Sequence, residues 1–147
     1  MGRPRRKGDA PARPSPDEAP LVAIVDDDAS VRQSTRRLIR SFGYRAEAYG
    51  SGDEFLSSAG AAEAACLVLD VRMPGVDGLD VQRRLAERDA RIPIVFLTGR
   101  ASDAEERRAW DAGAVAFLRK PVGRATLLQA LQKVLQTSRV QGDDDDE

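Results

Sequence analysis

Histidine is absent from this chain of 147 residues, and cysteine and tryptophan each occur once. Without histidine the chain has no Ser-His-Asp triad, no His-ligated zinc and no histidine of its own to carry a phosphoryl group. The single cysteine, Cys66, stands inside an apolar run, so we expect a core residue rather than a disulfide or a thiolate metal cluster. Apolar stretches long enough to span a membrane are lacking, as is any segment like a signal peptide.

Neither sign of charge dominates the sequence. The formal net charge is -1, with 41% hydrophobic and 32% charged residues. This composition fits one domain with a real core. Because no strong net charge draws it to polyanions, we expect the folded domain to bind neither nucleic acid nor a membrane, and we expect a cytoplasmic location.

The two ends differ from the middle in composition. Residues 1–20 combine basic residues with several prolines and little that can be buried, which predicts a disordered basic tail. Residues 139–147 end in the self-repelling acidic block Asp143–Glu147, which predicts a disordered acidic tail. The folded domain is therefore expected over residues 21–138, with no output domain after Ser138.

Apolar runs and helical periodicities alternate through this domain. The apolar runs predict strands at 21–25, 66–69, 92–97 and 115–118, with a weaker strand at 44–49. A helical pattern follows each strand, and the third of these helices, after the 66–69 strand, is expected around Leu79 to Arg88. Five strands alternating with five helices predict an α/β fold, namely a doubly wound, five-stranded parallel sheet with helices on both faces.

Local signals mark where several of these helices begin and which side is buried. Asp28 is the expected N-cap of the first helix, and Ser51 and Ser102 each open a capping box. In the helix opened by Ser102, Trp110 is the one large apolar residue and is expected to pack inside. The last helix places five apolar residues on one stripe: Leu127, Leu128, Leu131, Val134 and Leu135.

Polar residues stand where four of the strands end. They are Asp26 and Asp27, Asp70, Thr98 and Lys120. The carboxyl ends of parallel strands share one edge, which is where open α/β sheets bind ligands. Three close carboxylates stay ionised together only when a hard dication lies among them, and Mg²⁺ prefers oxygen ligands. An aspartate beside such a metal and a lysine is equipped to attack phosphorus and to carry the resulting acyl phosphate.

Five motifs in order resemble the receiver domain of two-component response regulators. They are Asp26-Asp27, the stretch LDVRMPG from Leu69 to Gly75, Leu97-Thr98-Gly99, Ala112-Gly113-Ala114 and Lys120-Pro121. The resemblance covers about Leu21 to Leu135 and implies the flavodoxin-like strand order 2-1-3-4-5. Within the family, the chain looks most like receivers of one class of helix-turn-helix transcription factors, the nitrogen-fixation-regulator-like class.

The resemblance also implies roles for the residues at the strand ends. Asp70 would accept a phosphoryl group from a phosphohistidine on a partner histidine kinase or phosphotransfer protein. Asp27, Asp70 and the backbone carbonyl of Arg72 would ligate Mg²⁺, with Asp26 reaching the metal through water. The chain would then be a phosphoacceptor, with only slow self-phosphorylation and autodephosphorylation, rather than an enzyme.

Two further residues would hold the phosphoryl group, and one would report its presence. Thr98 and Lys120 would bind the phosphoryl oxygens, and the bond between Lys120 and Pro121 would be a cis peptide, which X-Pro bonds adopt cheaply. Phe117 would respond to the state of Thr98.

The expected output is a switched surface. Apart from Trp110, the helix opened by Ser102 offers mainly alanines to the core, so few contacts hold it. Phosphorylation would shift this helix, the strand at 115–118 and the last helix, and would expose a face for a homodimer or a separate effector.

Three alternatives remain at this point. The chain could drain phosphate from a kinase without any output. It could be a receiver-like fold that binds a partner without phosphorylation. It could also be a magnesium-dependent phosphohydrolase of the haloacid dehalogenase type, because Asp26-x-Asp28 mimics the Asp-x-Asp motif of that class. Against this last class, the chain lacks the further acidic motif after Lys120 outside its terminal block.

Overall fold

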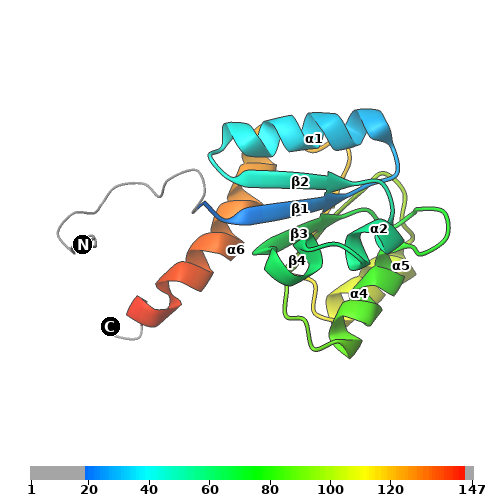
Figure 1. The fold of residues 1–147 in the computed structure, drawn as a ribbon. Helices are drawn as coiled ribbons and strands as arrows, with labels where there is room; N and C mark the ends of the chain where they lie inside the picture. The colour runs from blue at the N-terminus through cyan, green and yellow to red at the C-terminus, as the bar shows by residue number, and fades with distance from the viewer. Residues whose placement is uncertain (1–18, 145–147) are drawn as a thin grey trace.

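The computed structural model describes residues 19–144, and a five-stranded sheet with all strands parallel lies at its centre. The strands are β1 (Leu21–Val25), β2 (Arg45–Tyr49), β3 (Cys66–Leu69), β4 (Ile94–Thr98) and β5 (Ala116–Arg119). Their order in the sheet is β2-β1-β3-β4-β5 (Figure 1). The fold class and the strand order expected from the sequence are thereby confirmed.

Helices cover both faces of this sheet. They are α1 (Ala29–Ser41), α2 (Gly52–Leu56), α3 (Gly60–Glu63), α4 (Gly78–Glu87), α5 (Asp103–Asp111) and α6 (Arg124–Asp144). Side chains of α1 and α6 pack on one face, and those of α2, α4 and α5 pack on the other. The short helix α3 was not expected, because its Gly-Ala-Ala-Glu sequence carries no apolar periodicity.

The alternation of side chains along the buried strands produces two apolar layers. From β1, Ala23 and Val25 join the layer under α2 and α4, while Val22 and Ile24 join the layer under α1 and α6. Cys66 is fully buried in the second layer, as expected, and burial raises the pKa of its thiol to about 12. Each fully buried leucine or isoleucine contributes roughly 1.5–3 kcal/mol to the free energy of folding.

The apolar stripe of α6 is buried to different degrees. Leu127, Leu131 and Leu135 are buried, spaced four residues apart, while Leu128 and Val134 are only partly buried. A spacing of four residues keeps side chains on one face of a helix. The stripe is therefore narrower than the sequence pattern indicated.

Helix caps follow the sequence with one difference. The Asp28 carboxylate accepts the backbone N–H groups of Ser30 and Val31 at the start of α1, and Ser102 and Glu105 form a complete capping box at α5. At α2 the Ser51 hydroxyl accepts from the Glu54 N–H, but the Glu54 carboxylate accepts from the N–H of Gly50 rather than from Ser51. The capping box expected at Ser51 is thus only half formed.

Trp110 is the clearest departure from the expected packing. Its side chain is 45% exposed, whereas the neighbouring Ala109 is fully buried. The buried Gln82 amide donates to the Ala109 carbonyl at 3.1 Å, so α4 approaches α5 too closely for an indole on that side. The Trp110 ring N–H instead donates to the Glu106 carboxylate on the surface. The expectation that Trp110 packs inside was therefore wrong.

The described residues begin before Leu21 and continue after Ser138. Ala19 is buried, and its carbonyl accepts from the Arg45 side chain at 2.8 Å. At the other end, α6 continues past Ser138 to Asp144. Disordered tails were predicted over 1–20 and 139–147. Of these, residues 1–18 and 145–147 lie outside the described residues.

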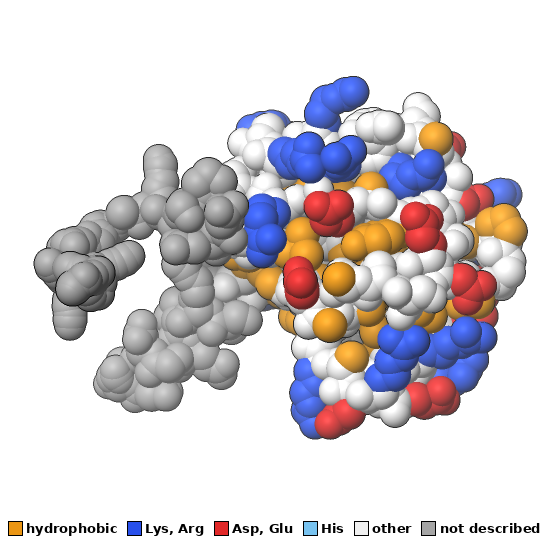
Figure 2. Space-filling model, viewed as in Figure 1, with side chains coloured by type: hydrophobic (Ala, Val, Ile, Leu, Met, Phe, Trp, Pro, Cys, Tyr) orange, Lys and Arg blue, Asp and Glu red, His pale blue; other side chains and the backbone are white. Residues whose placement is uncertain are grey.

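Charge is distributed unevenly over the helices. The helix α1 carries four arginines and no acidic residue. Figure 2 shows basic side chains gathered over this helix, with acidic ones below it. Among the described residues, no helix is long and apolar enough to cross a membrane.

Candidate phosphoacceptor and metal site

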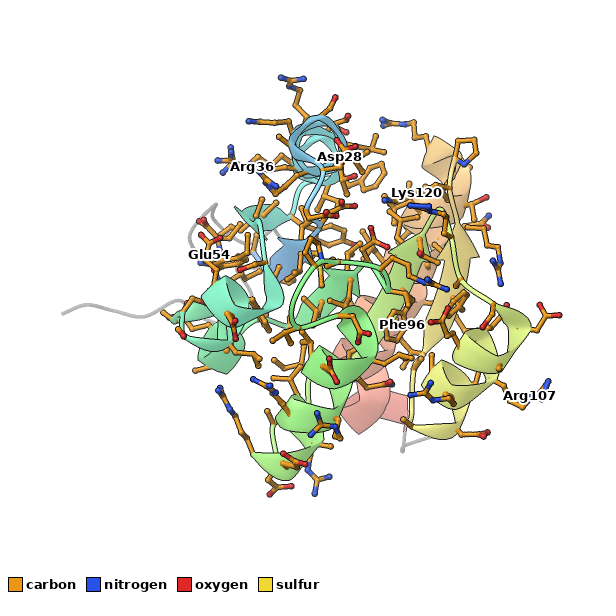
Figure 3. The ribbon with its side chains drawn as sticks, turned by 90° about the vertical axis from the view of Figure 1, so that its right-hand side faces the viewer. Asp28, Arg36, Glu54, Phe96, Arg107 and Lys120 are labelled. Atoms are coloured by element: carbon orange, nitrogen blue, oxygen red, sulfur yellow. The ribbon has the colours of Figure 1, made fainter. Side chains whose placement is uncertain are left out.

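The candidate site lies where the strands leave the sheet at their carboxyl ends. Parallel pairing of β1 with β3 sets Val25 beside Leu69, so the residues that follow, Asp26 and Asp70, emerge next to each other. Figure 3 looks onto this edge, where Asp28 at the start of α1 and Lys120 after β5 are both found. The sheet order places β1 beside β3, and Lys120 after β5 comes to the same edge because all five strands are parallel.

Lys120 joins the two buried carboxylates. Its ammonium nitrogen lies 2.8 Å from Asp26 Oδ2 and 3.2 Å from Asp70 Oδ2. Both carboxylates are nearly buried, with exposed side-chain fractions of 5% and 8%, while the Lys120 side chain is 21% exposed. The peptide bond after Lys120 is cis, as the resemblance implied. One cation thus balances part of the charge of two acids at this edge.

Burial and pairing shift two pKa values in the site. Burial raises the pKa of Asp26 above its ordinary value, and the hydrogen bond from Lys120 offsets this only in part. For Lys120, burial alone would lower the pKa, but the hydrogen bond to Asp26 and the charges of Asp70 and Asp26 outweigh it, so the pKa is raised. Lys120 therefore stays protonated at neutral pH and remains available to a phosphoryl oxygen.

Three carboxylates are close enough to share a cation. One oxygen from each of Asp26, Asp27 and Asp70 lies within 4.8 Å of the others. Asp27 is exposed, whereas the other two are buried, so the cluster opens to solvent on the side of Asp27. This donor set fits Mg²⁺, which takes oxygen ligands from one or two carboxylates and keeps several waters. The residues of the cluster can therefore hold a divalent cation.

Thr98 and Phe117 lie on the two neighbouring strands β4 and β5. Thr98 ends β4 and is fully buried, and its hydroxyl donates to the Arg100 carbonyl at 3.0 Å. Phe117 pairs in register with Phe96 across β4 and β5, with ring centroids 5.6 Å apart. Its ring is half buried, and the Arg119 guanidinium lies 5.4 Å from its centroid. In this structure the Thr98 hydroxyl is thus held by its own loop.

Gly78 is a structural part of the site that the sequence reasoning missed. A Cβ atom at this position would collide with the backbone carbonyl oxygen of Asp70, and the Gly78 N–H donates to the Val71 carbonyl at 2.9 Å. The loop after β3 therefore folds back onto the strand end at a point where only glycine fits. The signal in the sequence was its place directly after Asp77, the N-cap of α4.

Two ion pairs tie α5 to the site and to the neighbouring strand, and neither was expected. Arg72, two residues after Asp70, donates to Glu105 at 2.8 Å. Arg119, at the end of β5, donates to Glu106 at the same distance, 2.8 Å. Both glutamates belong to the first turn of α5. The first turn of this helix is therefore linked to the loop after Asp70 and to the strand that carries Phe117.

A hollow of about 440 Å³ adjoins the site on the side of α1 and α6. Its walls are mainly apolar: Val31, Ser34, Thr35, Leu38, Leu97, Lys120, Pro121, Val122 and Leu127. Lys120 lines this hollow and also contacts the acidic cluster. An apolar surface is thus continuous with the charged centre of the site.

The sequence and fold of known proteins agree with this geometry. The response regulator receiver domain family matches residues 22–132. The chain belongs to this family of two-component signalling domains.

Individual relatives show the same likeness. The response regulator protein TmoT of Ectopseudomonas mendocina is 41% identical over 119 residues, which make up 81% of this chain and 54% of that protein. A solved receiver protein from Burkholderia phymatum is 43% identical, with a TM-score of 0.70, and the match covers 80% of this chain and 95% of that chain. For the chemotaxis protein CheY4 of Vibrio cholerae the identity is 30% and the TM-score 0.72, covering 79% and 98%.

The chain spans about half the length of the curated relatives that it matches. The shared part is the receiver domain, for which phosphorylation of an aspartate is the expected role. Nothing in these likenesses favours the phosphohydrolase alternative.

Proposed function

We propose that the chain accepts a phosphoryl group on Asp70, in a Mg²⁺-dependent reaction, from a phosphohistidine on a partner kinase or phosphotransfer protein. The observation that carries this proposal is the contact of Lys120 with both Asp26 and Asp70. Among the described residues, Asp26 and Asp70 both belong to the acidic cluster and contact Lys120, and Asp70 is the one that follows the central strand β3. The folded domain over 21–138 would act in the cytoplasm, where kinases draw phosphate from ATP.

The chemistry follows from charge and position. A carboxylate oxygen of Asp70 forms a bond to phosphorus, and the bond from phosphorus to the donor breaks, with its electron pair leaving on the donor atom. Lys120 binds a phosphoryl oxygen, and the Thr98 hydroxyl donates to another after release from the Arg100 carbonyl. When bound to Asp27, Asp70 and the Arg72 carbonyl, with Asp26 through water, Mg²⁺ would neutralise charge on the phosphoryl oxygens.

The test uses acetyl phosphate as a small donor and intact-mass measurement. The full chain with Mg²⁺ is expected to gain one phosphoryl group, and Asp70→Asn is expected to gain none. Asp28→Asn is the matched control, because asparagine keeps the N-cap of α1 and should leave phosphorylation intact. If Asp70→Asn still became a labile phosphoprotein while Asp26→Asn did not, the phosphohydrolase alternative would be favoured instead.

We propose that the phosphohistidine protein docks with its apolar side chains in the hollow beside Lys120. A donor histidine must reach Asp70, and the hollow is the apolar surface that shares Lys120 with the site. Ser34→Arg fills this hollow from its exposed rim without removing a core side chain. We expect this variant to react normally with acetyl phosphate but slowly with a phosphohistidine protein. If Ser34→Arg and the wild-type chain reacted at equal rates with the phosphohistidine protein, docking in this hollow would be contradicted.

The output surface is proposed to be the face formed by α5, β5 and α6. The large hydrophobic side chains exposed among the described residues, Trp110 at 45% and Val115 at 43%, lie at the end of α5 and just before β5. Exposed apolar side chains close together favour contact with a partner. We expect a homodimer when beryllofluoride mimics the phosphoryl group, measured by light scattering, and a monomer for Trp110→Ala. A monomer in both cases would point to a separate effector or to a phosphate sink.

A further inference from the structure

Arg119 ends β5, directly before Lys120, and its guanidinium makes three contacts. One nitrogen donates to the Ala101 carbonyl at 3.0 Å, and the other donates to Glu106 Oε1 at 2.8 Å. The guanidinium carbon lies over the Phe117 ring, 5.4 Å from its centroid, which is within the range of a cation–π contact. Arg119 therefore joins the end of β5 to the first turn of α5 and to the loop before it.

Glu106 extends this connection to Trp110. While its Oε1 accepts from Arg119, its Oε2 accepts the indole N–H of Trp110 at 3.2 Å. The hydrogen bond from Arg119, followed by that from Trp110, lowers the pKa of Glu106, so the carboxylate stays ionised at neutral pH. The side chains of Arg119 and Glu106 are 44% and 32% exposed. One carboxylate on α5 thus binds both a guanidinium from β5 and an indole from its own helix.

The end of β5 is also fixed to the phosphoacceptor site. The Lys120 backbone N–H donates to the Thr98 carbonyl at 2.9 Å. The Lys120 ammonium group contacts Asp26 and Asp70. A phosphoryl group on Asp70 would carry about two negative charges, and it would draw this ammonium group away from the two carboxylates. Because Arg119 is the next residue in the chain, a movement of Lys120 acts on a guanidinium that is bound to α5.

We propose that Arg119 is a positioning residue that holds the end of β5 in its unphosphorylated arrangement and transmits a change there to Trp110. The inference rests on the proposed function of Asp70. Phosphorylation would loosen the contact between Arg119 and Glu106, and the hydrogen bond from Trp110 to Glu106 would change with it. Because an exposed ion pair contributes only a small free energy, the contact favours one arrangement without excluding the other.

Trp110 is the only tryptophan of the chain, so its fluorescence reports on α5 without a label. The full chain is measured with Mg²⁺, with and without beryllofluoride as a mimic of the phosphoryl group. We expect the mimic to shift the emission of wild type but not that of Arg119→Met, because methionine cannot donate to Glu106. Arg119→Lys keeps a cation beside Glu106 and is expected to retain the shift.

The rate of phosphorylation is an independent measurement. Because the contact of Arg119 favours the unphosphorylated arrangement, Arg119→Met should take up a phosphoryl group from acetyl phosphate faster than wild type. The expected factor is roughly two- to fivefold, which corresponds to one exposed ion pair. Glu106→Gln should have a similar effect and should add little to Arg119→Met, since both variants remove the same contact.

Arg107→Met is the matched control for both measurements. Arg107 is an exposed arginine of α5 whose side chain points away from the sheet (Figure 3). Its substitution removes one positive charge from the same helix without touching the contacts of Arg119. This variant should therefore match wild type in its emission shift and in its rate of phosphorylation.

The proposal is overturned if beryllofluoride raises the Tm of wild type without shifting its emission, or if Arg119→Met keeps the full shift. Phosphorylation of Arg119→Met at or below the wild-type rate overturns it as well, as does an equal effect of Arg107→Met. If wild type gains neither phosphoryl mass from acetyl phosphate nor stability from the mimic, the proposed function itself has failed. Mass and Tm thus distinguish that failure from a failure of the inference.

Discussion

At the scale of single residues, the site depends on a glycine with no chemistry of its own. Gly78 lets the chain after β3 pass against the Asp70 backbone, where a Cβ atom would collide with a carbonyl oxygen. Because backbone cannot move aside as a flexible side chain can, the loop that carries Arg72 must shift to accept any other residue. The glycine therefore fixes the position of the acceptor loop.

We expect Gly78→Ala to lower the free energy of unfolding by about 1–3 kcal/mol, the usual cost of overpacking. Urea unfolding measures the change. Gly123→Ala is the control, since no atom lies within 4 Å of the Cβ position there and its backbone is not left-handed. The control should stay within about 0.5 kcal/mol of wild type. Equal stability of Gly78→Ala and Gly123→Ala would show that the loop adapts freely.

A second prediction at this scale concerns Asp26. Its pKa is raised in the fold, mainly by burial, so the folded state binds its proton more tightly than the unfolded state does. The stability that this group contributes is present below the unfolded value of 3.8 and is lost as the pH rises through the raised folded value. At neutral pH the ionised Asp26 therefore destabilises the metal-free fold.

Asp26→Asn should consequently be more stable than wild type at pH 7 without metal. Asparagine can still accept the hydrogen bond from Lys120, so the gain comes from the lost charge. The advantage should shrink as the pH falls toward the ordinary range of aspartate. Urea midpoints at several pH values measure this, and a variant less stable than wild type at pH 7 would contradict it.

Single residues also show what the sequence can and cannot predict about the site. Asp26, Asp70 and Lys120 could be placed together because parallel strands bring their carboxyl ends to one edge. That Lys120 contacts both acids depends on side-chain geometry, which the spacing of residues in the sequence does not predict. The pairing of Arg72 with Glu105 joins residues 33 positions apart through flexible side chains, so it could not be predicted. The roles of these residues in phosphoryl transfer stay predictions.

At the scale of elements, α5 holds the core through a single buried side chain. It buries Ala109 and is otherwise tied down by its capping box and by surface ion pairs of Glu105 and Glu106. Exposed ion pairs add little stability. The first turn nevertheless contacts both the loop after Asp70 and the end of β5, so a change at the site reaches this helix directly.

We expect a phosphoryl mimic to change hydrogen exchange in α5 and β5 and to leave β1 unchanged. The reason is that α5 has few buried contacts, whereas β1 is buried along its whole length between two neighbouring strands. Exchange is measured by mass spectrometry on the full chain with Mg²⁺, with and without beryllofluoride, and Asp70→Asn serves as the control. Unchanged protection from Ser102 to Lys120 would contradict a switch and leave the phosphate-sink alternative.

Elements also differ in how well the sequence predicts them. The strands were predictable because their buried apolar runs end in turn residues. The packing of α5 was not, because Ala109 and Trp110 are adjacent and only the approach of Gln82 from α4 decides which one faces inward.

At the scale of the whole molecule, the acidic cluster lies at the ends of the central strands. Asp26 and Asp70 extend β1 and β3, which occupy the interior of the sheet, and Asp27 opens the cluster to solvent. A cation bound there contacts only the folded state, because the unfolded chain does not bring these carboxylates together. Binding at the edge must therefore stabilise the entire fold by mass action.

We expect Mg²⁺ at ten times its dissociation constant to stabilise the fold by about 1.4 kcal/mol. For a domain of this size, that corresponds to a rise in Tm of roughly 3–6 °C. Thermal melts at constant ionic strength, with sodium chloride replacing magnesium chloride, separate specific binding from screening of repulsion among the carboxylates. Asp26→Asn should melt higher than wild type without metal and should gain less from Mg²⁺, since one carboxylate of the cluster is gone. A rise in Tm that is the same in wild type and in Asp26→Asn would mean that the cation binds elsewhere, and the acidic cluster would lose its assignment as the metal site.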